Sequence, residues 1–206
     1  MKVAILGGTG AMGSGLASQL SKKHEVQIGS RDLRKAREAA AKIAGVRGDT
    51  NRAAALWCET AVVAVPFSAV GSLKEFSRAL SGKLVVSTIN PLRSEGTVLQ
   101  YASDGPSAAE LVARSLPQSS VSTAFNNVPA AFVRRPPKVG VHVLVATDTR
   151  DAYEETAMLV RAVPRMEPLY VGPLSQAESV ERLTVMVLNA ASFEGNLRFA
   201  PRFVSK

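Results

Sequence analysis

The sequence predicts an α/β protein with a mostly parallel sheet and a small helical segment at its carboxyl end. Short apolar runs alternate with amphipathic or alanine-rich segments, a pattern typical of repeated strand–helix units with right-handed crossovers. A glycine-rich turn directly follows the first apolar run. The chain has 206 residues, which suits one such domain with a short carboxyl-terminal addition and excludes a large separate substrate domain.

The first half of the chain contains the clearest elements. Lys2–Leu6 is apolar and β-branched, and Met12, Leu16 and Leu20 recur every four residues, so we expect a strand, a turn and then a helix. Further strands are expected at 25–30, 61–65 and 84–88. Further helices are expected at 32–44, which is alanine-rich, and at 107–116.

The second half begins with a long irregular segment. Residues 89–106 are rich in Asn, Pro, Ser and Gly. Loops of this length in compact domains are usually functional, so we expect this one near the site. Strands are expected at 121–125 and 141–146, on either side of a basic, proline-rich turn at 134–138, and a helix is expected at 151–162.

The last expected helix, 176–193, is apolar on more than one face, and its apolar residues include Leu183, Val187 and Ala191. Such a helix is buried in the fold or in a dimer, and we expect a homodimer. We place a boundary near residue 117. Residues 1–117 would bind a nucleotide, and residues 118–206 would complete the sheet and cover the substrate cleft.

The charge balance bears on possible partners. Lys and Arg number 25 against 17 for Asp and Glu, and this net charge of +8 suggests nucleic acid, an anionic membrane or a polyanionic small molecule. The basic residues are scattered in ones and twos, and aromatic residues make up only 5% of the chain. No helix-turn-helix, RNA-binding or finger motif is present. We therefore expect a small-molecule partner and no nucleic acid.

The residues suited to disulfides and metals are few. The chain has one cysteine, Cys58, and two histidines, His24 and His142, which we interpret as structural. A single cysteine forms no internal disulfide, and this set is too poor for a zinc or iron–sulfur site. No apolar run approaches the roughly 18 residues that span a bilayer, and residues 3–6 are too short for a signal-peptide core. We expect a cytoplasmic protein with no metal site and no membrane contact.

The segment Gly8-Thr9-Gly10-Ala11-Met12-Gly13 matches the pattern G-x-G-x-x-G. It lies directly after an expected strand and at the start of an expected helix, the context of dinucleotide-binding Rossmann folds. Glycine permits positive φ and close backbone approach, and the free amides of a helix start attract a pyrophosphate. We therefore expect a Rossmann-type fold with phosphates on this turn. The alternative is a tight turn without a ligand.

The end of the second strand indicates which nicotinamide cofactor binds. NAD enzymes place an Asp or Glu there, but this chain has Ser30 and Arg31, with Lys35 one turn further. A hydroxyl and two cations suit the 2′-phosphate of NADP(H). Two alternatives are that Arg31 is a solvated surface charge and that Asp32 binds the ribose. We interpret Asp32 as a helix cap.

The whole chain resembles the NADPH-dependent reductases of the deazaflavin coenzyme F420. The resemblance rests on the glycine motif, on Gly29-Ser30-Arg31 with Lys35, and on Ala64-Val65-Pro66-Phe67. It also rests on a tail that Rossmann folds in general lack, namely Gly172-Pro173-Leu174-Ser175, Val180-Glu181-Arg182-Leu183-Thr184 and Leu188-Asn189. The resemblance implies direct hydride transfer between nicotinamide C4 and deazaflavin C5, with both rings stacked in a cleft under the carboxyl-terminal segment.

The motif and the resemblance together give the expected site residues. Those on the NADP(H) side are Gly8, Thr9, Gly10, Ala11, Met12, Gly13, Ser30, Arg31, Lys35, Pro66, Phe67 and Ala130, and those on the deazaflavin side are Asn90, Asn126 and Val128. No residue is assigned as catalytic, and Asn126 is a possible ring contact. It stands where some family members have a histidine, so amide or backbone donors would meet the charge on the ring. Asn126 and Asn127 are alternatively turn residues before Pro129.

Other functions remain open at this point. One is an NADPH-dependent reductase of a flavin, a quinone or a ferric chelate. Another is a redox sensor that binds NADP(H) without turnover and regulates a partner through the apolar carboxyl-terminal helix. The deazaflavin coenzyme has an anionic tail, which suits the basic residues expected near the cleft, although each of these is alternatively a solvated surface charge. They are Arg93, Arg134, Arg135 and Lys138.

Overall fold

A computed structural model describes residues 1–195 and 199–204 and contains an eight-stranded sheet in the order β10-β9-β8-β5-β4-β1-β2-β3. Its strands are β1 (Lys2–Leu6), β2 (Glu25–Ser30), β3 (Val46–Thr50), β4 (Thr60–Val63), β5 (Leu84–Ser87), β8 (Ser120–Thr123), β9 (Val141–Thr147) and β10 (Met166–Gly172). Neighbouring strands are parallel except β8 and β9. The predicted Rossmann-type α/β fold with a mostly parallel sheet and a carboxyl-terminal helix is confirmed.

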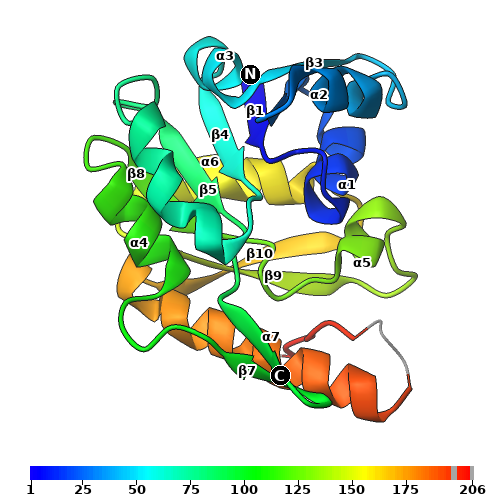
Figure 1. Ribbon diagram of the computed structural model, residues 1–206. Helices are drawn as coiled ribbons and strands as arrows, with labels where there is room; N and C mark the ends of the chain where they lie inside the picture. The colour runs from blue at the N-terminus through cyan, green and yellow to red at the C-terminus, as the bar shows by residue number, and fades with distance from the viewer. Residues whose placement is uncertain (196–198, 205–206) are drawn as a thin grey trace.

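Helical segments cover both faces of this sheet (Figure 1). They are α1 (Ala11–Leu20), α2 (Leu33–Ala40), α3 (Asn51–Trp57), η1 (Phe67–Phe76), α4 (Ala108–Ser115), α5 (Ala130–Arg134), α6 (Arg150–Arg161), η2 (Leu174–Gln176) and α7 (Ala177–Phe193). Because side chains alternate along a strand, Val3 and Ile5 of β1 enter one core with α1, α2 and α6. Ala4 and Leu6 enter a second core with α3, η1 and α4.

The strand order reverses at β1, which pairs with β2 on one side and with β4 on the other. In open parallel sheets, ligands bind outside the carboxyl ends of the strands at such a switch point. β1 leads into the glycine-rich turn, and its neighbour β4 leads into the segment that follows Val63. The fold therefore places the predicted phosphate turn where a crevice is expected.

The segment expected to be a long loop, 89–106, contains an antiparallel hairpin of β6 (Leu92–Glu95) and β7 (Val98–Tyr101). The loop prediction is wrong there, because every residue of β6 is exposed and leaves no apolar alternation to recognise. Figure 1 shows the hairpin beside α7, away from the main sheet. The helix expected at 32–44 ends earlier, at Ala40, because the chain turns through Gly45 (φ 74°) into β3.

Among the helices that the structure describes, none combines the length and the apolar character needed to cross a bilayer.

Candidate functional site: a cleft at the switch point of the sheet

A cleft of about 620 Å³ opens at the carboxyl ends of β1, β2, β4 and β5. Its walls come from five segments that are far apart in the sequence: the glycine-rich turn, the end of β2 with the start of α2, the start of α3, η1 with the residues before it, and the residues after β5. The predicted site residues that line it are Thr9, Gly10, Ala11, Met12, Gly13, Ser30, Arg31, Lys35, Pro66, Phe67 and Asn90. Most of the predicted nucleotide side therefore lies around one cavity.

The glycines of the turn are required for different reasons. Gly7 has φ of 75°, and a Cβ there would lie 2.8 Å from the carbonyl oxygen of Ala64. A Cβ on Gly13 would lie 2.6 Å from the Cα of Gly8, so these two glycines allow α1 to approach the turn. Gly8 is buried and lies outside the cleft lining. A Cβ on Gly10, by contrast, would meet no atom closer than the Gly7 carbonyl oxygen at 3.8 Å.

The start of α1 is suited to an anion. Its N-cap residue, Gly10, has no side chain to accept a hydrogen bond from the first-turn amides. Thr9, Gly10 and Ala11 are exposed at the cleft. Helix N-terminal amides without a capping side chain carry partial positive charge and commonly bind phosphate. The exposed amides at the start of α1 are therefore suited to hold a pyrophosphate.

A hydroxyl and two cations lie together at the end of β2. Ser30 Oγ accepts a hydrogen bond from the Asp32 amide at 3.2 Å, and Arg31 and Lys35 are exposed at the cleft. Neither cation forms an ion pair with any residue that the structure describes. Both are consequently available to an anionic ligand.

Asp32 caps α2, as predicted. Its Oδ1 accepts hydrogen bonds from the amides of Arg34 at 2.9 Å and Lys35 at 3.2 Å. The bond from the Lys35 amide is the main reason that the pKa of Asp32 is lowered, so the cap is ionised. Because this oxygen is used within the helix, the cap interpretation of Asp32 is confirmed by its contacts.

Asn51 is a cleft residue that the sequence did not reveal. Its Oδ1 accepts a hydrogen bond from the Gly7 amide at 3.2 Å, which fixes the start of the glycine-rich turn. Asn51 opens α3, and Thr50 caps that helix through the Ala53 amide at 3.2 Å. The pair Thr50-Asn51 before an alanine run is an N-cap signal that could have located α3.

The opposite wall of the cleft contains Asn90 but not the other predicted deazaflavin residues. Asn126 is 3% exposed, and its Nδ2 donates to the Ile89 carbonyl at 2.8 Å while its Oδ1 accepts from Thr123 Oγ1 at 2.6 Å. Asn127 likewise bonds to the backbone of β9. Val128 is buried and Ala130 half-buried, both outside the cleft lining. A ring contact by Asn126 therefore still rests on the family resemblance, and its own contacts are structural.

The basic residues expected to face an anionic tail are divided between two places. Arg134, Arg135 and Lys138 line a separate hollow of about 440 Å³ after α5. Arg93 lies on the hairpin, where its Nη2 donates to Gln100 Oε1 at 3.3 Å. None of these four cations belongs to the lining of the main cleft.

These features define a Rossmann-class protein built to bind a nicotinamide dinucleotide. They are the strand order of the sheet, the start of α1 without a capping side chain, and Arg31 and Lys35 at the cleft after β2. Residues 2–91 match the protein family described as NADP oxidoreductase, coenzyme F420-dependent. The F420-dependent NADP reductase of Methanothermobacter marburgensis is 37% identical to this chain over 209 residues, covering 92% of each. The chain belongs to the family of F420-dependent NADP reductases.

Further similarities agree with this membership. The F420-dependent NADP reductase of Methanothermobacter thermautotrophicus is 36% identical over 206 residues, covering 92% of this chain and 88% of the relative. A crystal structure of a protein from Arthrobacter sp. FB24 is similar with a TM-score of 0.90 at 24% identity, and the match covers 100% of both chains. The fold therefore extends over the carboxyl-terminal part as well as the glycine-rich half.

Proposed function

We propose that this protein transfers a hydride directly between NADP(H) and coenzyme F420. Family membership supports the reaction, and the observation that carries the cofactor choice is the group of Ser30, Arg31 and Lys35 beside an uncapped helix start. Among the described residues that line the cleft there is no cysteine and no histidine. Catalysis by holding two rings in contact requires shape and orientation rather than a nucleophile.

The proposed binding mode follows the walls of the cleft. The amides of residues 9–13 hold the pyrophosphate, and Ser30, Arg31 and Lys35 hold the 2′-phosphate. Pro66 and Phe67 form the wall along which the nicotinamide reaches the acceptor. When bound, NADPH supplies the hydride from its C4. Residues 1–117 would thus form the nucleotide side, and residues 118–206 the part that completes the sheet and supports the acceptor side.

The acceptor side is proposed to centre on Asn90. Asn126 supports it from behind the cleft wall, because its backbone carbonyl accepts a hydrogen bond from Asn90 Nδ2 at 3.0 Å. Val128 stays a proposed residue of this side, and Ala130 stays one of the NADP(H) side. The substrate class is an anionic small molecule, in keeping with the net charge of +8. We keep the cytoplasmic location as a prediction.

Acceptor competition tests the proposed reaction. The purified protein is mixed with NADPH and oxidised F420, and loss of the visible absorbance of F420 is followed, with NADH as donor control and FMN and a ferric chelate as rival acceptors. We expect fast bleaching with NADPH and F420 alone. Equal or faster reduction of FMN or of the ferric chelate would show that F420 is not the preferred acceptor. NADPH binding without reduction of any acceptor would favour a sensor.

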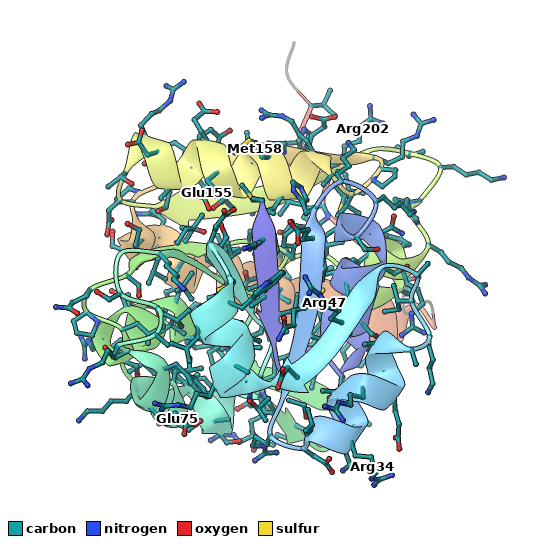
Figure 2. All side chains as sticks on the ribbon, turned by 90° about the horizontal axis from the view of Figure 1, so that it is seen from above. Arg34, Arg47, Glu75, Glu155, Met158 and Arg202 are labelled. Atoms are coloured by element: carbon teal, nitrogen blue, oxygen red, sulfur yellow. The ribbon has the colours of Figure 1, made fainter. Side chains whose placement is uncertain are left out.

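We further propose that the protein is a homodimer joined through α7. Met186 and Phe193 on this helix are 62% and 69% exposed, although large apolar side chains usually become covered. Met186→Glu should shift the mass measured by light scattering after gel filtration from dimer to monomer. Met158→Glu is the matched control, because Met158 is also an exposed methionine but lies on α6, outside the proposed interface (Figure 2). A wild-type monomer contradicts this proposal.

A further inference from the structure

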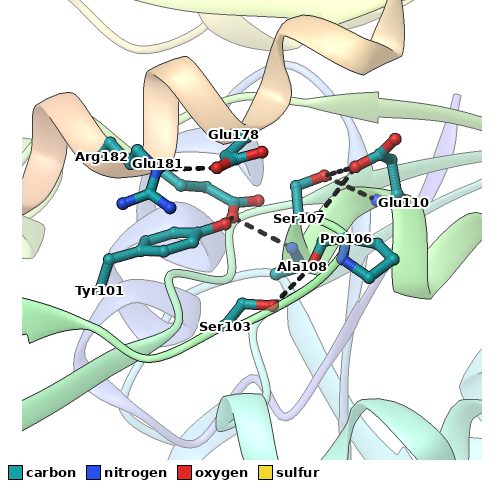
Figure 3. A network of polar contacts seen from close by, with 9 residues as sticks. All are labelled: Tyr101, Ser103, Pro106, Ser107, Ala108, Glu110, Glu178, Glu181 and Arg182. Carbon is teal, nitrogen blue, oxygen red and sulfur yellow. Dashed lines mark hydrogen bonds and ion pairs between the residues drawn. The ribbon is translucent and has the colours of Figure 1, made fainter.

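Glu181 is a buried carboxyl group outside the cleft. It lies in α7 and is 0% exposed, between the hairpin and the start of α4 (Figure 3). Burying a carboxyl costs free energy unless its oxygens are hydrogen-bonded. The proposed hydride transfer gives this residue no direct part, so its contacts indicate what it does.

Glu181 connects three elements. Its Oε2 accepts hydrogen bonds from Tyr101 Oη on β7 at 2.8 Å and from the Ala108 amide at 3.0 Å. Its Oε1 accepts from the Ala109 amide at 3.2 Å. The two amides belong to the first turn of α4 and have no partner within that helix. One side chain on α7 thereby holds both the hairpin and the start of α4.

Two further contacts join the hairpin to α7. The guanidinium of Arg182 lies 4.2 Å from the centre of the Tyr101 ring. Two turns further along the helix, the Asn189 side chain exchanges two hydrogen bonds of 2.8 Å with the backbone of Leu99. The hairpin is therefore held at both ends of β7 by α7, with Glu181 as the buried member of this set.

The hairpin in turn forms part of the cleft. Tyr101 pairs with Leu92 across the two strands, and the Ala102 amide donates to the Pro91 carbonyl at 2.8 Å. Leu92 and Asn90 both line the cleft. Displacing Tyr101 would consequently displace the wall that contains these two residues.

A second contact from the same face of α7 reaches the backbone carbonyl to which Asn90 is bonded. Thr184, which follows Glu181 by three positions, donates from Oγ1 to the Asn126 carbonyl at 3.1 Å. The same carbonyl accepts the hydrogen bond from Asn90 Nδ2. Residues three positions apart share a helix face, so a shift of α7 at Glu181 would be transmitted to Asn90 as well.

We propose that Glu181 is a positioning residue for the acceptor side of the cleft, which holds Tyr101 and the start of α4 and thereby fixes Leu92 and Asn90 where the acceptor ring binds. This inference rests on the proposed function and deepens it. The contacts of Glu181 are with α4 and the hairpin, whereas the glycine-rich turn, Ser30 and Arg31 lie on other elements. Binding of the acceptor depends on Glu181, and binding of NADP(H) does not.

The ionisation of Glu181 gives this role a pH signature. Burial raises the pKa of Glu181 to about 7, against hydrogen bonds from Ala108, Tyr101 and Ala109 that lower it, and the charge of Glu110 on α4 raises it further. On α7, Glu178 and Arg182 pair with each other at 2.7 Å. The segment η2 has no ionisable side chain, and His142, the ionisable residue of β9, accepts a hydrogen bond from the Phe203 amide.

The neutral and ionised forms of Glu181 differ in what they can hold. The carboxylate accepts all three hydrogen bonds, whereas the protonated group turns an O–H toward donors. Burial also raises the pKa of Tyr101, which therefore remains a donor throughout this range. The KM for the acceptor should rise as the pH falls through about 7, the pKa of Glu181.

The test compares Glu181→Gln with Glu178→Gln. Both variants remove one carboxylate from α7, but Glu178 is half-buried and pairs with Arg182, whereas Glu181 is fully buried and holds Tyr101 and two amides of α4 directly. For Glu181→Gln we expect a roughly tenfold higher KM for F420, the loss expected when a buried charged hydrogen bond is removed. The Kd for NADPH should stay within about twofold of the wild type, and the change of acceptor KM near pH 7 should disappear. Glu178→Gln should resemble the wild type in all three.

Hydrogen exchange of residues 92–101 in the substrate-free protein separates this inference from the proposed reaction. Exchange should be faster in Glu181→Gln than in Glu178→Gln, whichever acceptor the protein uses. If Glu181→Gln does not fold, Tyr101→Phe, which removes one of the three bonds, takes its place and should raise the acceptor KM by a smaller factor. Unchanged exchange of the hairpin, or an acceptor KM and pH profile like those of the wild type, would overturn the inference. An equal loss of NADPH affinity would do the same.

Discussion

At the scale of single residues, close backbone contacts leave no room for a side chain at Gly7, Gly8 and Gly13, and Asp32 caps the helix that follows it. The type and spacing of these residues are enough to predict their roles from the sequence. Asn51 and Glu181 gave no such signal. Their roles depend on which distant segment they meet, Gly7 for one and Tyr101 for the other, and those contacts exist only after folding.

Arg31 should determine the preference for NADPH over NADH. Its guanidinium is exposed at the cleft next to Ser30, where a 2′-phosphate would be met by charge-assisted hydrogen bonds. Such a bond contributes about 1.5–3 kcal/mol, so Arg31→Ala should weaken NADPH binding roughly tenfold to a hundredfold. Binding of NADH should change little. Titration of nicotinamide fluorescence measures both.

Arg34→Ala is the matched control for Arg31. Arg34 is a neighbouring arginine on α2 that pairs with Glu38 at 2.8 Å and points to the periphery of the molecule (Figure 2). It should leave both affinities unchanged. If Arg31→Ala weakened NADPH and NADH binding equally, Arg31 would not be a 2′-phosphate ligand.

His24 should make the protein less stable in mild acid. Both ring nitrogens are buried without a hydrogen-bond partner among the described residues. Burial, followed by the charges of the amino terminus and Lys23, lowers the pKa of His24 from its ordinary 6.5. Below pH 6.5 the unfolded chain therefore binds a proton that the folded chain resists, and the free energy of unfolding falls as the pH falls.

Urea unfolding of the wild type and of His24→Met at several pH values measures this effect. The variant should lose less free energy of unfolding than the wild type between pH 7.5 and pH 5. Identical losses in the two proteins would show that His24 takes up its proton as freely in the folded state as in the unfolded state.

At the scale of elements, two strands of the main sheet that the sequence did not predict, β3 and β10, lie at its edges. The central strands are buried on both faces and read as apolar runs, which the sequence shows clearly. β3 and β10 are the two edges of the sheet. β3 has the largely polar sequence VRGDT, so it lacks the apolar run of the central strands. β10 contains Pro168, which an edge strand tolerates because it pairs with a neighbouring strand on one side only.

Gly48 on β3 should be essential for the packing of α2. A Cβ at this position would collide with the backbone of Ala36 on α2, which has no freedom to move aside. Gly48→Ala should lower the free energy of unfolding by about 1–3 kcal/mol or more, as overpacking does. Gly71→Ala is the control, since a Cβ on Gly71 meets nothing within 4 Å. Thermal unfolding compares the two, and equal melting temperatures would contradict this account of the β3–α2 contact.

At the scale of the whole molecule, the alternation of strands and helices was sufficient to predict the fold class, and the glycine-rich turn, predicted to bind phosphates, lies at the cleft. The acceptor side was harder to predict. It is built from a hairpin with exposed strands and from α7, which are joined by side chains rather than by the main sheet. Contacts of this kind between distant segments leave no pattern in the local sequence.

Isotope transfer tests most directly the claim that the two rings exchange a hydride in one cleft. NADPH carrying deuterium at C4, in the position that the enzyme transfers, is reacted with oxidised F420 in ordinary water, and the reduced F420 is analysed by mass spectrometry. A parallel reaction uses unlabelled NADPH in D₂O, with the product analysed for deuterium at C5. The account predicts that C5 receives deuterium from the labelled NADPH and none from the solvent. Reduced F420 without the label from NADPH, or with deuterium at C5 from D₂O, would contradict direct transfer.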